Sequence, residues 1–130
     1  MILQLVRPEQ IRRYWPTIKK GVDKLVTKSI TGWIPEDLYC DVHEGRTQLY
    51  LLVDNKYYVG FVAVQIFNQN MHIWTAYCEK PDQLEIGLNL LKDLAIQDNI
   101  QTITFSSDRK AWQKVAGKLG FRPNTYLLSL

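Results

Sequence analysis

The hydrophobic period of the chain changes twice, and this constrains the fold more than any other feature of the sequence. Between about residues 10 and 28, apolar side chains recur at helical spacing. Over residues 48–79 they follow the spacing of strands, in three runs separated by short turns rich in Asp and Asn. Over residues 84–95 the helical period returns. Three strands enclosed between helical segments indicate a mixed α/β domain.

The remaining segments complete the order strand, two helices, three strands, helix, strand, helix, strand. The expected elements are a strand at 2–6, helices at about 10–28 and 35–45, strands at 48–54, 57–67 and 71–79, a helix at 84–95, a strand at 100–106, a helix at about 112–120 and a strand at 125–130. A helix that connects the fourth strand to the fifth makes these two strands parallel, whereas the three consecutive strands before it form an antiparallel meander. The sequence therefore predicts a mixed sheet.

Length and composition exclude several classes of protein. A chain of 130 residues is expected to form a single domain over residues 1–130. It contains no apolar run long enough to span a membrane, and its start, MILQLVRPEQ, lacks the pattern of a secretory signal, so we expect synthesis in the cytoplasm. A formal charge of +3, with basic residues scattered along the chain, argues against a nucleic-acid binder. Cys40 and Cys78 lie far apart without clustered histidines, so no metal site is expected.

Two short stretches resemble the GNAT family of N-acetyltransferases. YYVGFVAVQ is similar to the third strand of that family, and LGFRPN resembles the Gly-Phe that follows its last helix. The resemblance covers nearly the whole chain and implies a GNAT-like fold, a mixed sheet of six to seven strands flanked by about four helices. It also implies that the fourth and fifth strands diverge near Cys78 to leave a V-shaped opening.

The turn after the fourth strand departs from the family pattern. GNAT enzymes hold the pyrophosphate of acetyl-CoA on a turn with the pattern Arg or Gln, two residues, Gly, one residue, then Gly or Ala, which opens a helix whose N–H groups face the phosphates. Here Asp82 stands in place of the Arg, Glu85 in place of the first Gly, and only Gly87 is kept. Like charges near the surface repel by on the order of 1 kcal/mol or more, so we expect no cofactor. Without a phosphate, such acids suit a helix start as caps.

The catalytic residues implied by the resemblance are also altered. Many GNAT enzymes carry on the last helix a Tyr that protonates the departing thiolate, and this position is Ala116 here. The residues that commonly precede it correspond to Arg109 and Trp112, and Trp112 fits a core anchor better than a ligand platform. The fourth strand, from which the family often draws a general base, offers His72 and Glu79 as candidates.

Three functions remain open. The first is a non-catalytic GNAT-fold protein that contacts a protein partner or associates with itself, since the chain is similar to small GNAT-like proteins of tailed bacteriophages, some of which are virion components. Its interface candidates are Trp33, which follows a glycine in the stretch SITGWI, and Tyr57 and Tyr58 on the meander. Such a protein would be made in the host cytoplasm and could be incorporated in a virion.

The second function is an acetyl-CoA-dependent N-acetyltransferase with a divergent turn. Backbone N–H groups near the start of the helix would then hold the phosphates, with Lys80, Ile86, Gly87 and Leu88 as the candidate cofactor-binding residues. The third is a phage-encoded inhibitor of a host protein, which the sequence does not separate from the first.

Overall fold

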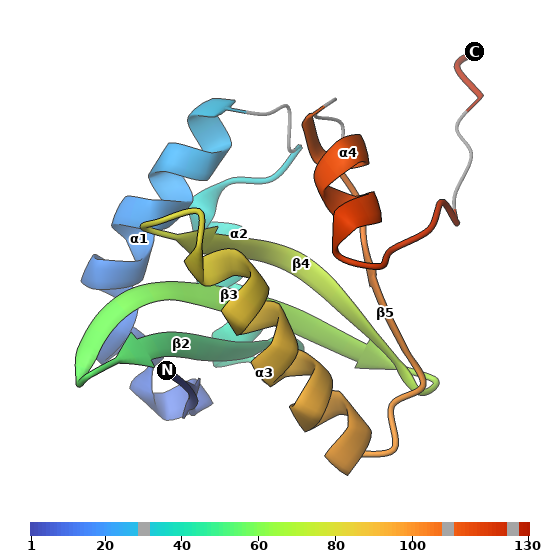
Figure 1. Ribbon diagram of the computed structural model, residues 1–130. Helices are drawn as coiled ribbons and strands as arrows, with labels where there is room; N and C mark the ends of the chain where they lie inside the picture. Colours follow the sequence, from blue (N-terminus) through green and yellow to red (C-terminus); the bar gives the residue numbers. More distant parts are fainter. Residues whose placement is uncertain (29–31, 108–110, 125–127) are drawn as a thin grey trace.

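A five-stranded mixed sheet lies at the centre of the computed structural model, which describes residues 1–28, 32–107, 111–124 and 128–130 (Figure 1). A short 3-10 helix at Pro8–Gln10 precedes the first long helix. The elements are β1 (Ile2–Val6), α1 (Ile11–Lys28), α2 (Pro35–His43), β2 (Gln48–Asp54), β3 (Tyr57–Phe67), β4 (Asn70–Cys78), α3 (Gln83–Gln97), β5 (Thr102–Phe105) and α4 (Ala111–Lys118). The strands lie in the sheet in the same order as in the chain. Pairing is antiparallel from β1 to β4 and parallel between β4 and β5, as the crossover through α3 predicts.

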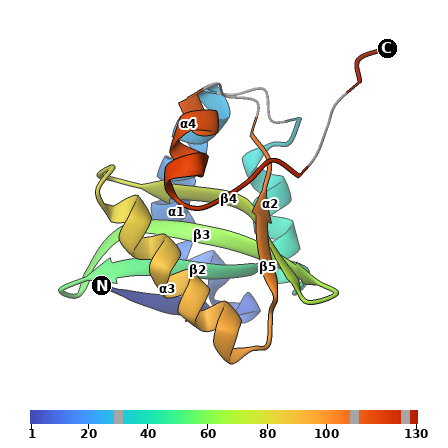
Figure 2. The same ribbon diagram turned by 45° about the vertical axis from the view of Figure 1, so that its right-hand side comes forward.

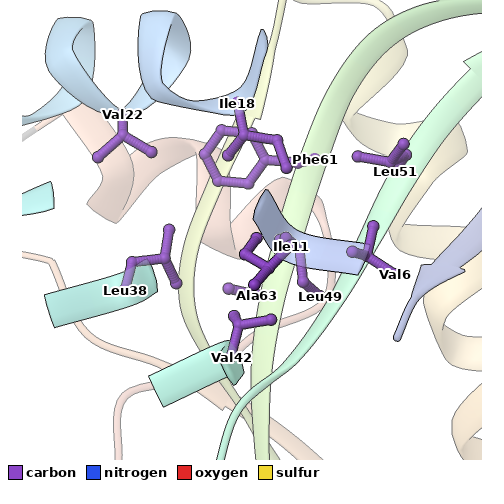
Figure 3. Close-up of a cluster of buried hydrophobic side chains, with 10 residues drawn as sticks. All are labelled: Val6, Ile11, Ile18, Val22, Leu38, Val42, Leu49, Leu51, Phe61 and Ala63. Atoms are coloured by element: carbon purple, nitrogen blue, oxygen red, sulfur yellow. The ribbon is translucent and has the colours of Figure 1, made fainter. Parts of the chain in front are cut away.

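Helices cover both faces of the sheet, α1 and α2 one face and α3 and α4 the other (Figures 1 and 2). Because strands alternate their side chains between faces, each face has its own core. The core under α1 and α2 contains Val6, Ile11, Ile18, Val22, Leu38, Val42, Leu49, Leu51, Phe61 and Ala63 (Figure 3). The core under α3 contains Tyr50, Val62, Val64, Met71, Leu91 and Ala95.

Two hairpin turns make the antiparallel meander possible. Asn55 and Lys56 between β2 and β3, and Asn68 and Gln69 between β3 and β4, all have positive φ angles of 48° to 68°. Two consecutive residues in this left-handed region give the turn whose twist matches that of paired strands. Both turns fall where the Asp- and Asn-rich segments of the sequence predict them.

Glycines let α1 and β3 approach β4 closely. A β-carbon on Gly21 of α1 would lie 2.6 Å from Cδ1 of the Tyr77 ring, and a β-carbon on Gly60 of β3 would overlap the Tyr77 carbonyl oxygen. Tyr77 therefore lies where a helix and a strand both come closer to β4 than a side chain would allow.

The sheet has fewer strands than expected. The described residues form five strands and not six to seven. The strand predicted at 125–130 falls partly outside the described residues, and residues 128–130 have no regular structure. The four predicted helices are present.

Candidate functional site

The parallel strands β4 and β5 diverge halfway along β4. Their pairing runs from Asn70 opposite Thr102 to Ile73 opposite Phe105, where β5 ends. Beyond it, among the described residues, Thr75–Cys78 pair only with β3. The divergence predicted near Cys78 thus exists but begins earlier, because β5 ends at Phe105, which lies opposite Ile73.

A β-bulge marks the start of the divergence. Ala63 of β3 lies opposite Thr75 and Val64 lies opposite Ile73, so Trp74 has no partner residue on β3. An extra residue of this kind bends a strand and increases its twist, which turns the end of β4 away from the direction of β5.

The turn that leads from β4 into α3 is held by a hydrogen bond between its backbone and a side chain at the start of α3. The backbone N–H of Lys80 donates to Oε1 of Gln83 at 3.1 Å, and Gln83 is buried. The prediction that acids cap this helix is wrong for Asp82, whose side chain makes no capping hydrogen bond. Sequence reasoning missed Gln83, although a Pro after Lys80 and a Gln three residues after it are a known signal of a helix start.

Three carboxylates surround this turn. Glu79, Asp82 and Glu85 are all exposed, and none forms an ion pair among the described residues. Lys80, the candidate phosphate ligand, is exposed beside them. The local charge is thus net negative at the end of the helix where the dipole favours an anion.

The three remaining cofactor candidates have different surroundings. A β-carbon on Gly87 would lie 3.4 Å from both methyl groups of Leu52, an ordinary contact, so Gly87 faces β2 but its position does not require a glycine. Leu88 is buried and Ile86 is 48% exposed. The glycine that the turn shares with the GNAT pattern therefore packs against Leu52 of β2 here.

Aromatic residues gather on the other face, next to α1. Trp33 lies against Trp74 with ring centroids 5.2 Å apart, and both rings pack against the core under α1 and α2. Lys24 of α1 donates to the hydroxyl of Tyr77 at 3.3 Å and lies over the ring of the same residue. Trp33 is thus half-buried, while its predicted role in association stays a prediction.

The two tyrosine candidates differ in exposure. Tyr57 is 75% exposed. The hydroxyl of Tyr58 is buried without a hydrogen-bond partner in the described chain, and burial, with smaller contributions from Tyr77, Glu79 and Cys78, raises its pKa. Burial also raises the pKa of the Cys78 thiol. Tyr57 is therefore the more accessible of the pair, and the role of both in association stays a prediction.

The candidate bases are far apart. Nδ1 of His72 lies 2.9 Å from Oγ1 of Thr104, which also accepts a hydrogen bond from Nδ2 of Asn70. This network lies where β4 and β5 pair, whereas Glu79 follows the other end of β4. At a rise of about 3.3 Å per residue, roughly 20 Å separates them along the strand. The structure therefore does not bring His72 and Glu79 together.

The last helix offers no proton donor at the position implied by the resemblance. Ala116 of α4 is half-buried and has no ionisable group. Trp112 packs edge-on against Phe105 with centroids 5.6 Å apart, in agreement with its predicted role as an anchor. Arg109 lies outside the described residues.

A hollow of about 310 Å³ lies at the far end of α3, between that helix, β5 and the segment after α4. Its walls are mostly apolar, with Lys92 as the basic residue among them. Neither the acidic turn nor the aromatic residues near α1 line it.

Within the described ranges, no group of His, Cys, Asp or Glu side chains is arranged to hold a metal ion. In the same part of the chain, none of the helices has the length and apolar character needed to cross a membrane.

Comparisons of sequence find no match to a family model or to a curated protein. Comparison of structures finds many matches over the whole chain. A probable acetyltransferase has a TM-score of 0.70 at 19% identity, covering 100% of this chain and 98% of the other. A GNAT family acetyltransferase from Staphylococcus aureus has a TM-score of 0.65 at 16% identity, covering 99% and 96%. An aminoglycoside N-acetyltransferase in complex with CoA has a TM-score of 0.58 at 10% identity, covering 98% and 96%. The fold is that of the GNAT acetyltransferases, as the sequence predicts.

Proposed function

We propose that this chain uses the GNAT fold for protein contact and does not bind acetyl-CoA. The observation that carries the proposal is the turn before α3, where Oε1 of Gln83 takes up the Lys80 N–H and the carboxylates of Glu79, Asp82 and Glu85 stand exposed. A pyrophosphate at this turn would be repelled by these carboxylates. It would also lack the Lys80 N–H as a donor, because Gln83 already accepts from it. The proposal extends to a role in a phage virion, to which the sequence resemblance points.

Two further features support the absence of catalysis. Ala116 cannot protonate a thiolate. Nδ1 of His72 is also engaged, because it lies 2.9 Å from the Thr104 hydroxyl in a hydrogen bond whose direction depends on the tautomer of the ring. Neither residue is therefore placed as the acid or base that acetyl transfer requires.

An acetyl-CoA-dependent N-acetyltransferase is the second candidate, and one observation favours it. The divergence of β4 from β5 after Ile73, with the bulge at Trp74, is the opening that the family resemblance implies. The similar structures include acetyltransferases, one of them in complex with CoA.

Isothermal titration calorimetry of the full chain with acetyl-CoA near neutral pH separates the two functions. We expect no saturable heat. A micromolar or tighter dissociation constant would overturn the proposal and favour the enzyme. Titration of a known GNAT acetyltransferase under the same conditions serves as the positive control.

A further inference from the structure

The second half of β4 has an unpaired edge on the side of the strand that pairs with β5 in its first half. From Thr75 to Cys78 the strand pairs with β3 on one side, and within the described part of the chain no strand pairs with Trp74–Cys78 on the other side. The backbone hydrogen bond from the Glu79 N–H to the Val59 carbonyl continues the pairing with β3 past the end of β4. Strand edges of this kind offer backbone donors and acceptors to another extended chain.

The surroundings of this edge suit an extended polypeptide. Trp74 and Tyr77 pack against the core under α1 and α2, and Ala76 packs against the core under α3. Residues Trp74–Cys78 are all half-buried and do not lie open on the surface. An added strand would thus place its side chains alternately beside aromatic rings and beside a small residue.

The negative charge that follows Cys78 favours some extended segments over others as partners of this edge. The strand leads directly to Glu79, and Asp82 and Glu85 follow on the turn, all exposed and without ion pairs among the described residues. Opposite charge on a partner speeds association and suppresses wrong partners. A segment with basic ends is therefore favoured over one with acidic ends.

We propose that an extended, basic-ended segment of a partner protein adds as a strand to the edge of β4 at Trp74–Cys78, between β4 and β5. The inference rests on the proposed function, since it names the surface and the kind of partner that the protein contact uses. It also gives the acidic turn a role: the carboxylates that disfavour a pyrophosphate attract the basic end of the segment.

The test uses the full chain and a defined probe, a capped peptide of about seven residues in which threonine and valine alternate between a lysine at each end. Binding is followed by the amide NMR signals of the protein at low salt. We expect shifts and slowed hydrogen exchange at Trp74–Cys78, and an affinity about tenfold lower for the same peptide with glutamate at each end. A peptide with proline at its centre should not bind, because it lacks a ladder donor.

Charge reversal supplies the matched control. Asp82→Lys with Glu85→Lys should reverse the preference between the two peptides. Glu9→Lys with Asp93→Lys changes the net charge equally at exposed positions outside the turn and should leave the preference intact.

Shifts on the edges of β1 or β5, or no binding at millimolar peptide, would overturn the inference. So would self-association of the chain through Trp74–Cys78 that excludes the peptide, since a second copy would then be the occupant. These outcomes leave the proposed function standing if acetyl-CoA does not bind, whereas tight binding of acetyl-CoA removes the proposed function itself.

Discussion

The carbonyl oxygen of Tyr77 on β4 fills the space in which a side chain on Gly60 of β3 would begin. Gly60→Ala should therefore force the two strands apart and destabilise the fold by roughly 2–4 kcal/mol, in the upper range for a single substitution. Urea unfolding followed by circular dichroism measures the change. Gly87→Ala is the control, because its new methyl group would meet Leu52 at an ordinary 3.4 Å. Equal stability of the two variants would contradict the close approach.

Gln83→Ala should destabilise the protein by about 1 kcal/mol, since the Lys80 N–H loses its acceptor at the start of α3. The amide signal of Lys80 should at the same time exchange faster with solvent. Gln97→Ala, at the exposed end of the same helix, is the control and should change stability little. An unchanged Lys80 amide would show that the turn is held in another way.

Asp82→Arg together with Glu85→Gly should create measurable acetyl-CoA binding, because the pair restores a positive charge and a close backbone approach at the turn. Calorimetry against the unmodified chain gives the difference. Asp93→Arg with Asp98→Gly, at the other end of α3, controls for net charge and should bind no cofactor. If the turn variant also gains nothing, the correspondence of this turn with the GNAT pattern is wrong.

Stability should fall as the pH rises above about 10, the ordinary pKa of tyrosine. Burial raises the pKa of Tyr58 in the folded protein, so above that pH the unfolded chain releases a proton that the folded protein keeps. Tyr58→Phe should flatten this loss, and near neutral pH it should leave stability unchanged or slightly higher, because the hydroxyl has no partner. A loss of more than about 1 kcal/mol near neutral pH would indicate a hydrogen bond to that hydroxyl. Tyr57→Phe, at an exposed position, is the control.

Trp33→Ala should lower stability, because Trp33 packs on Trp74 and against the core under α1 and α2. A double-mutant cycle with Trp74→Ala should give a coupling energy of about 0.5–1.5 kcal/mol. The same variants, compared by light scattering, test whether Trp33 also anchors association. If Trp33→Ala leaves the melting temperature unchanged and abolishes association, Trp33 acts as an interface anchor and not as a packing residue.

The order of elements was predictable from the sequence because periodicity and turn residues are local signals. The meander over residues 48–78 and the crossover through α3 are both of this kind. The place where β4 and β5 diverge was not, since it depends on the bulge at Trp74 and on the register that sets the end of β5 opposite Ile73. The packing of Trp33 on Trp74 joins segments far apart in the chain, which no local pattern reveals.

At the candidate site, the sequence identified the acidic character of the turn but not the means by which the turn is held. Charge is a property of residue type, so Glu79, Asp82 and Glu85 are visible in the sequence. The hydrogen bond from Lys80 to Gln83 has a local signal in the Pro and Gln that follow Lys80, but the burial of Gln83 depends on how α3 packs on the sheet, which residue type does not show.

The order of strands in the sheet has a consequence for how the protein is made. Each strand after β1 pairs with the strand that precedes it in the chain, so a nascent chain leaving the ribosome can extend the sheet by one strand at a time. The longest stretch of chain between two paired strands is the one between β1 and β2, which contains α1 and α2. Once β2 has emerged, every later pairing closes a shorter loop, and the entropy lost at each closure is correspondingly smaller.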